Sequence, residues 1–148
     1  MISIRPFTEQ DAPVIRQNQY PETGLAEIRE MIAEWGTNTC RGRHFEMYAV
    51  TADGAVVGSV SLYGHTESIA SVGIEVYPDE RGKGYASEGM RQIIRRAEAL
   101  GYRIIQDQVR TDNRASIAMH RRLGFETDGY VYRNAKGRDV LVYLLCLR

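Results

Sequence analysis

The sequence has little cysteine and no long hydrophobic run, and each absence excludes a class of protein. Its 148 residues include two cysteines, Cys40 and Cys146, which lie far apart and outside any CxxC pattern. This does not fit a disulfide-stapled secreted domain, so we interpret both cysteines as structural and expect a cytoplasmic, reducing setting. No segment approaches the roughly 20 apolar residues of a membrane span, and the first residues lack the apolar core of a signal peptide.

An excess of charge of one sign is also missing. Lys plus Arg equal Asp plus Glu at 19 each, so no overall field attracts nucleic acid or an anionic membrane, and any anion site must be local. The three histidines, His44, His65 and His120, show no metal-ligand spacing, so we expect no metal site. The chain is 43% hydrophobic and 26% charged, which is typical of a globular protein, and its length predicts one domain over residues 1–148.

Hydrophobic periodicity predicts an α+β domain with a mixed sheet and helices packed on its faces. The predicted strands cover residues 2–6, 45–51, 55–63, 70–77, 103–111, 125–133 and 140–147. The predicted helices cover residues 8–18, 25–35, 84–100 and 113–123. Asp53-Gly54 is a strong hairpin signal between two of the strands.

One turn has the features of a diphosphate site. A predicted strand is followed by Arg81-Gly82-Lys83-Gly84-Tyr85-Ala86, where a long amphipathic helix begins. Unpaired N–H groups and the helix dipole attract phosphate at such a helix start, and glycines let the backbone approach it closely. The Walker pattern fails because Lys83 is not followed by Ser or Thr, and the dinucleotide pattern fails because Ser87 takes its last position.

The turn resembles the diphosphate turn of the Gcn5-related N-acetyltransferase (GNAT) superfamily. In that family a Gln or Arg is followed three residues later by Gly, and two residues after that by Gly or Ala; Arg81, Gly84 and Ala86 meet this pattern. A second family motif is similar as well: Asn113-Arg114-Ala115-Ser116, then Leu123-Gly124-Phe125 at the usual spacing. The stretch GYASEG is similar to the branch that includes the ribosomal-protein N-terminal acetyltransferases.

The resemblance implies a single GNAT-like domain with a mostly antiparallel mixed sheet, a splayed central strand pair and helices on both faces. It also implies direct transfer of an acetyl group from acetyl-CoA to a primary amine, without a metal. Backbone groups of Ile74, Glu75 and Val76, together with Asn113, would then bind the pantetheine arm. The turn Arg81–Ala86 would bind the diphosphate, and Asn113 can also cap the helix that it precedes.

Two side chains are candidate catalytic residues. The attacking amine must lose a proton, and Glu75 is our candidate to take it, directly or through water, or to hold a cationic substrate. The alternative is a solvated strand residue or a salt-bridge partner. Some relatives carry the base where this chain has Gln108, and an amide cannot accept the proton.

His120 is the second candidate, because many relatives have a tyrosine there that protonates the leaving sulfur. We expect His120 to donate a hydrogen bond to sulfur. We also expect Arg121, Arg122 and the helix dipole to disfavour its cationic form. The alternative is a histidine that packs beside the cofactor. Arg114 and Arg121 are candidates for the adenosine phosphate, although a solvated helix face explains them equally well.

The sequence does not identify the amine acceptor, and protein N-termini, polyamines, amino acids and aminoglycosides all stay open. By resemblance, segments 19–24 and 132–138 build the acceptor site. Acidic and aromatic side chains that could line it are Glu46, Tyr48, Tyr63, Glu67 and Tyr130. The resemblance also suggests a homodimer through the tyrosine-bearing end strands, with no nucleic-acid or membrane partner. The alternatives are a non-catalytic acyl-CoA-binding or sensor domain, which Gln108 and His120 would suit, and an unrelated nucleotide-binding domain.

Overall fold

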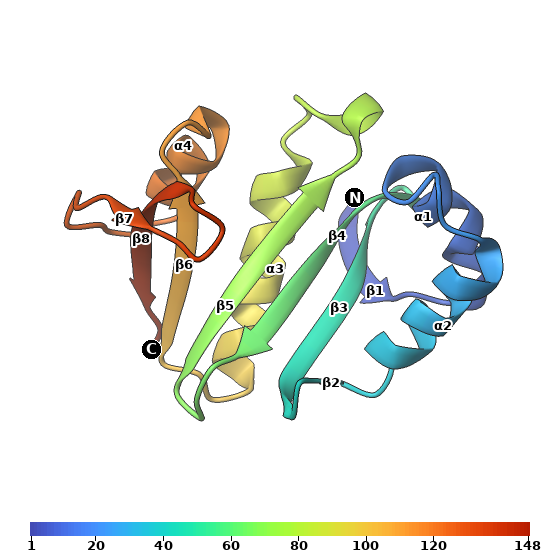
Figure 1. Ribbon diagram of the computed structural model, residues 1–148, viewed down its shortest axis with the longest axis horizontal. Coiled ribbons are helices and arrows are strands. Elements are labelled where there is room, and N and C mark those ends of the chain that lie inside the picture. The colour runs from blue at the N-terminus through green and yellow to red at the C-terminus, as the bar shows by residue number, and fades with distance from the viewer.

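Alternating apolar side chains build one mixed sheet in the computed structural model, which describes residues 1–148 (Figure 1). The strands are β1 (Ile2–Pro6), β2 (Thr39–Cys40), β3 (Arg43–Ala52), β4 (Ala55–Gly64), β5 (Ile69–Val76), β6 (Ile104–Arg110), β7 (Tyr132–Arg133) and β8 (Asp139–Cys146). Their order is β1-β3-β4-β5-β6-β8-β7, and β2 pairs with β3. Only β5 and β6 are parallel, so the predicted mostly antiparallel mixed sheet is confirmed.

The hairpin predicted at Asp53-Gly54 joins β3 to β4. Both residues have positive φ, 50° at Asp53 and 88° at Gly54, as a type I′ turn requires. The turn follows directly on the pair Ala52↔Ala55, and the register of the two longest strands then shifts between Thr51 and Val50. These strands form the middle of the continuous part of the sheet.

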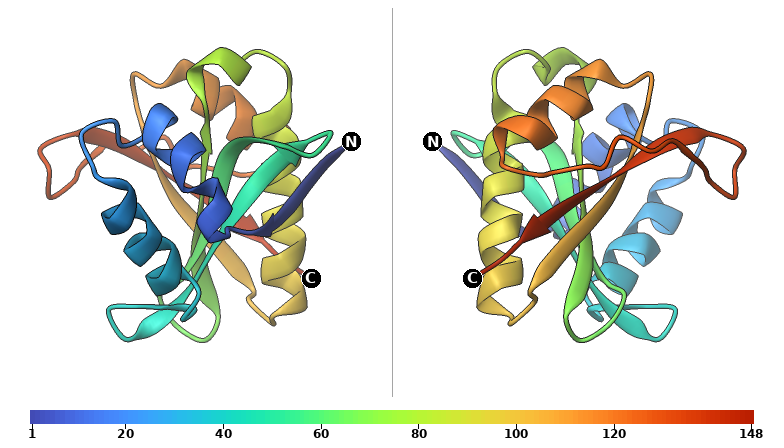
Figure 2. Two further views of the ribbon diagram at one scale, coloured as in Figure 1. Left: turned by 90° about the vertical axis from the view of Figure 1, so that its right-hand side faces the viewer. Right: turned by 90° about the vertical axis from the view of Figure 1, so that its left-hand side faces the viewer.

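Helices cover both faces of the sheet, as predicted (Figure 2). α1 (Ala12–Asn18) and α2 (Leu25–Trp35) lie on one face, and α3 (Tyr85–Ala99) and α4 (Arg114–Arg122) lie on the other. Two hydrophobic cores follow from this arrangement. The larger core, on the α3 face, includes Met90 and Ile93, whereas the smaller core includes Ile15 and Ile28.

The sheet divides between β5 and β6. These strands pair only at Ile69↔Ile104 and Ala70↔Ile105, and the ladder then ends. On its other side β5 stays paired with β4 from Ala70 to Val76. Beyond Ala70 the two parallel strands therefore diverge, which confirms the expected splayed pair.

Two predicted elements differ from the structure. The strand expected over residues 125–133 is wrong apart from β7 and one isolated bridge, Glu126↔Leu144. Asp128 accepts a hydrogen bond from the Tyr130 N–H at 2.9 Å, and Gly129 has a φ of 77°, so a local turn interrupts the strand. The first helix begins as a 3-10 turn, Glu9–Asp11, and becomes α-helical only at Ala12, where Pro13 follows.

Candidate functional site

The glycine turn forms the N-terminal end of α3. Gly84 is the residue before the first helical one and has a φ of 82°, and Gly82 has a φ of 79°. A Cβ atom at either glycine would meet no other atom within 4 Å, so the turn has open space in front of it. The first N–H groups of a 15-residue helix are thus accessible to a ligand.

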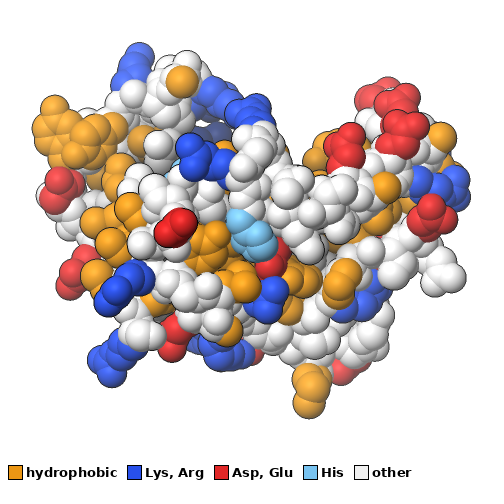
Figure 3. Space-filling model, turned by 90° about the horizontal axis from the view of Figure 1, so that it is seen from below, with side chains coloured by type: hydrophobic (Ala, Val, Ile, Leu, Met, Phe, Trp, Pro, Cys, Tyr) orange, Lys and Arg blue, Asp and Glu red, His pale blue; other side chains and the backbone are white.

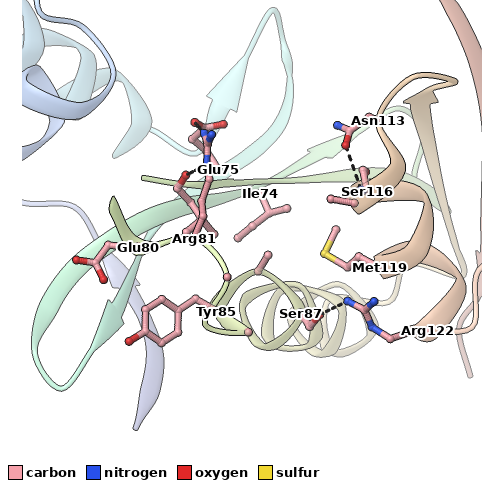
Figure 4. Close-up of a pocket in the computed structure, with 15 residues that line it drawn as sticks. Ile74, Glu75, Glu80, Arg81, Tyr85, Ser87, Asn113, Ser116, Met119 and Arg122 are labelled. Carbon is pink, nitrogen blue, oxygen red and sulfur yellow. Dashed lines mark hydrogen bonds and ion pairs between the residues drawn. The ribbon is translucent and has the colours of Figure 1, made fainter. Parts of the chain in front are cut away.

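A cleft of about 540 Å³ lies in front of this turn, between β5, α3 and α4 (Figure 4). All the predicted cofactor-binding residues line it except Lys83: they are Ile74, Val76, Arg81, Gly82, Gly84, Tyr85, Ala86 and Asn113. Sequence reasoning missed Glu80, Ser87, Ala115, Ser116, Met119 and Arg122 as lining residues. Helical spacing from the predicted Asn113 could have found Ser116 and Met119, which follow it by three and six residues.

The open edge of β5 supplies main-chain groups to the cleft. The Val72 N–H points toward β6, where it donates to the Asp107 side chain, and the Val76 carbonyl accepts from Arg81 Nε at 2.9 Å. Main-chain groups alternate in direction along a strand, so Ile74 also presents its N–H and carbonyl to this side. Because β6 has diverged, no strand pairs with them there.

Glu75 lies on the cleft wall, but its carboxylate faces a cation. Arg81 Nη2 is 3.3 Å from Glu75 Oε1, and both side chains are about half exposed, 60% for Arg81 and 47% for Glu75. Glu75 therefore stands as an ion pair beside the cleft. Lys83 instead pairs with Glu80, at 3.1 Å, and the Glu80 carboxylate raises the pKa of Lys83.

α4 forms the opposite wall. Asn113 Oδ1 accepts a hydrogen bond from the Ser116 N–H at 3.1 Å, so the predicted helix cap is confirmed. Arg122 Nη2 donates to Ser87 Oγ at 3.2 Å and connects α4 to α3 (Figure 4). Of the arginines on this helix, Arg122 lines the cleft, whereas the candidates Arg114 and Arg121 do not.

A second space, of about 310 Å³, lies beside the cleft at the gap between β5 and β6. Ile74 and Ser116 line both spaces, so the two are adjacent at these residues. The second space is also lined by Ser71, Val72, Gly73, Met90, Asp107, Gln108 and His120. The predicted candidates Gln108 and His120 thus lie together beside the diverging strands.

His120 is buried, and hydrogen-bond acceptors occupy both of its ring nitrogens. Nε2 lies 2.9 Å from Asp107 Oδ2, and Nδ1 lies 2.8 Å from the Ser116 carbonyl oxygen. Burial lowers the pKa of His120, but the bonds to Asp107 and Ser116 outweigh it and raise the pKa above its ordinary value. These two bonds favour the cationic form of the imidazole, whereas we expected from the sequence that its charge would be disfavoured. His120 lies in the last turn of α4, where the helix dipole favours a cation, and the sequence did not reveal its carboxylate partner.

Some of the residues suggested for the acceptor site lie elsewhere, whereas the roles suggested for Tyr63, Tyr130 and segments 19–24 and 132–138 stay predictions. Glu46 and Tyr48 face α3, where Glu46 is buried and pairs with Arg96, so their predicted place in the acceptor site is wrong. Glu67 lines a separate hollow near Tyr102, and Tyr130 is 63% exposed. Figure 3 shows the surface notched between the part that carries β6–β8 and the part that carries α1 and α2.

No helix of the chain is long and apolar enough to cross a membrane. No three His, Cys, Asp or Glu side chains lie close enough together to hold a metal ion.

A sheet whose parallel strands diverge beside a glycine turn at a helix N-terminus is typical of folds that bind acyl-CoA. The chain belongs to the acetyltransferase (GNAT) domain family, which it matches over residues 2–126. It is 41% identical over 56 residues to an L-methionine sulfoximine/L-methionine sulfone acetyltransferase of Pseudomonas paraeruginosa. That match covers 38% of this chain and only about a third, 33%, of the relative's length.

Solved structures share the whole fold. The ribosomal L7/L12 α-N-protein acetyltransferase in complex with coenzyme A superposes with a TM-score of 0.83 at 21% identity, over 99% of this chain and 94% of that one. The spermidine N-acetyltransferase of Vibrio cholerae in complex with CoA and spermine has a TM-score of 0.79 at 17% identity, over 98% and 95% of the two chains. The first of these belongs to the branch that the turn resembled.

Proposed function

We propose that this protein is an acetyl-CoA-dependent N-acetyltransferase in which a primary amine attacks the thioester directly. One observation carries the proposal. A cleft that ends at the glycine turn of α3 adjoins, at Ile74 and Ser116, a second space at the gap between β5 and β6. A long thioester fits such a two-part space, with its diphosphate at the turn and its acyl group where the strands diverge.

The residues present fit that cosubstrate. Acetyl-CoA supplies a diphosphate, a pantetheine arm and an acyl thioester. The N–H groups after Gly82 and Gly84 would hold the diphosphate with Arg81. The open main-chain edge at Ile74 and Val76 would bind the amide-bearing arm and polarise the thioester carbonyl, and such preorganised donors contribute about 3 kcal/mol to transition-state stabilisation.

Proton transfer needs groups at both ends of the reaction. Glu75, paired with Arg81 beside the cleft, would orient a cationic amine or a water that takes its proton. At the leaving group, Ser116 Oγ lies 3.3 Å from His120 Nδ1 and borders both spaces. Ser116 can donate its proton to sulfur while His120 restores it, so His120 would act through Ser116 rather than by direct contact.

The acceptor belongs to the primary amines, and the relatives suggest which ones to try. Their names include L-methionine sulfoximine, a ribosomal-protein N-terminus and spermidine. The notch between β6–β8 and α1–α2 would admit the amine from the sheet face opposite α3 (Figure 3). A homodimer, from the family resemblance, and a cytoplasmic location, from the two isolated cysteines, complete the proposal.

The test combines a binding and a transfer measurement. Calorimetry should detect CoA binding, and release of free thiol from acetyl-CoA should follow addition of one amine from a panel of L-methionine sulfoximine, spermidine, an aminoglycoside and a short peptide with a free N-terminus. CoA binding without transfer to any amine would favour a sensor domain. No CoA binding at millimolar ligand would overturn the whole assignment.

Two glycines provide a matched pair of variants. Gly84 before α3 and Gly101 after it both have positive φ, 82° and 95°, and open space where a Cβ would be. Gly84→Val and Gly101→Val therefore impose similar backbone strain. We expect Gly84→Val to weaken CoA binding at least tenfold, and Gly101→Val to lower thermal stability with CoA affinity within twofold. Equal loss of affinity in both variants would contradict the placement of the diphosphate.

A further inference from the structure

The division of the sheet is bridged by a buried side chain. Where the β5–β6 ladder ends after Ala70↔Ile105, Asp107 of β6 reaches across the gap. Its Oδ1 accepts the Val72 N–H of β5 at 3.0 Å, and its Oδ2 pairs with His120 Nε2 of α4 at 2.9 Å. One carboxylate thus connects three of the four elements that line the second space, β5, β6 and α4, while α3 contributes Met90.

This carboxylate is well shielded from water. Asp107 is 4% exposed and His120 is 5% exposed, and Phe125 packs edge-on against the imidazole with ring centroids 4.8 Å apart. A buried polar side chain whose oxygens are both bonded holds its geometry closely, because any movement leaves a bond unmade at a cost of about 1–3 kcal/mol. Asp107 is therefore rigid where the surrounding ladder is absent.

We propose that Asp107 is a positioning residue that sets the separation of β5 from β6 and α4, and thereby the width of the acyl-binding end of the cleft. This inference rests on the proposed acetyl transfer. In a continuous parallel ladder the Val72 N–H would bond a β6 carbonyl directly. Here a carboxymethyl group stands between the two backbones, one residue beyond the bond from Ser71 Oγ to the Gln106 carbonyl oxygen, so its length fixes how far apart they lie at this point.

The position of the reacting groups follows from the same contacts. Two residues beyond Val72 lies Ile74, whose main chain borders the acyl end, and on the opposite wall His120 holds the Ser116 carbonyl at 2.8 Å. A longer or shorter spacer at Asp107 moves Ile74 relative to Ser116. A displacement of about 1 Å between such groups costs about a hundredfold in rate in many enzymes.

Length and charge can be separated by two conservative variants. Asp107→Asn keeps the length and the acceptor for the Val72 N–H, and its amide can donate to a neutral His120. Asp107→Glu keeps the charge and adds one methylene. We expect Asp107→Glu to lower kcat at least tenfold, and Asp107→Asn, which keeps the length but removes the charge beside His120, to lower it by a smaller factor. The affinity for CoA should stay within threefold in both, because β5 and α3 build the glycine turn without Asp107.

Glu46→Gln is the matched control. It replaces the other buried, helix-paired carboxylate, which lies on β3 outside both spaces, and it should lower the melting temperature while kcat stays within twofold. The proposal is overturned if Asp107→Asn is less active than Asp107→Glu, if both match the wild type, or if Glu46→Gln loses as much activity as Asp107→Glu.

Amide exchange provides a readout that does not need turnover. The Val72 N–H should be protected from hydrogen exchange in the wild type and in Asp107→Asn, and exposed in Asp107→Glu. If the wild type transfers no acetyl group, the proposed function fails, while the Val72 measurement still decides whether Asp107 spans the strands. Equal Val72 protection in all three proteins would overturn the positioning role alone.

Discussion

Two buried carboxylates face the same side of the sheet but have opposite structural roles. Glu46 of β3 sits within a continuous ladder and receives two bonds from Arg96 of α3, at 2.9 and 3.0 Å. Asp107 of β6 sits where the ladder has ended and pairs with His120 of α4. The first pair fastens a helix to a complete sheet, whereas the second spans an opening in it. The comparison teaches that a fold can use one kind of contact to close one region and to keep another open.

The cationic partner determines how each ion pair responds to pH and to substitution. A guanidinium stays charged at every accessible pH, and Glu46 also accepts bonds from Tyr48 and His44. An imidazole titrates near neutrality, and Asp107 has only the Val72 N–H besides it. The region around Asp107, which holds the site, should therefore respond more strongly to pH and to substitution than the region around Glu46.

The largest effect is expected from His120→Phe. The variant leaves the Asp107 carboxylate buried without its cation, which costs roughly 3 kcal/mol or more in free energy of unfolding. Turnover should also fall tenfold or more, because Ser116 loses the group behind it, while CoA affinity changes little. Denaturant unfolding and steady-state kinetics measure the two losses. Unchanged turnover would remove His120 from the mechanism.

Arg96→Met is expected to have a smaller effect, confined to stability. Arg96 is 43% exposed, so the loss should be about 2 kcal/mol, below the range for a fully buried pair. Turnover measured well below the melting temperature should stay within twofold, because the pair lies outside both spaces. A tenfold fall in turnover would mean that the two regions are coupled.

The pH dependence of the free energy of unfolding should distinguish the two pairs, with the next largest effect. Burial opposes ionisation of Glu46, but the bonds from Arg96, Tyr48 and His44 outweigh it and lower the pKa to about 2. Its contribution is therefore present above the usual pKa of 4.5 and is lost as the pH falls toward about 2. Glu46→Gln should flatten this acid limb of the stability curve.

The alkaline side reports on His120, whose pKa is raised above 6.5. Its contribution is present below 6.5 and is lost as the pH rises through the raised pKa. The titratable groups that face it are Asp107 of β6 and Tyr143 of β8, whose ring centroid is 5.6 Å away, while Val72 of β5 and Met90 of α3 carry no charge. Urea midpoints measured from pH 3 to pH 10 should lose this decline in His120→Gln, and a decline as steep as in the wild type would contradict it.

The smallest effect is expected at an exposed pair. Lys83 and Glu80 pair at 3.1 Å with side chains 51% and 33% exposed. Lys83→Met should leave the stability almost unchanged, because solvent screens an exposed ion pair. CoA affinity should stay within twofold, because Lys83 does not line the cleft although it lies in the glycine turn. A tenfold loss in calorimetry would show that Lys83 swings to the diphosphate on binding.

Local signals made the turn predictable from the sequence. Two glycines followed by a helical hydrophobic period indicate the start of α3, and Asp53-Gly54 indicates the β3–β4 hairpin. Both signals depend on residues adjacent in the chain. The same holds for the Asn113 cap. The family motifs predicted that β5 and β6 diverge, which no local sequence pattern indicates.

Long-range pairs could not be predicted in this way. Asp107 and His120 are 13 residues apart on different elements, and Glu46 meets Arg96 across 50 residues. No pattern adjacent in the chain marks these partners, so the sequence predicts neither the burial of Glu46 against α3 nor the carboxylate beside His120. The strand predicted over residues 125–133 is mostly absent for another reason: the turn at Asp128 and Gly129 outweighs the strand propensity of its neighbours.

The hydrogen bond from Arg122 to Ser87 connects α4 to α3 across the cleft, and other contacts hold these two helices in place. Both side chains are at least partly accessible, so the bond contributes only about 1 kcal/mol and opens by rotamer changes in nanoseconds. We expect this bond not to limit the release of a coenzyme from the proposed site, so the residence time of the coenzyme should depend on how firmly the glycine turn binds its phosphates.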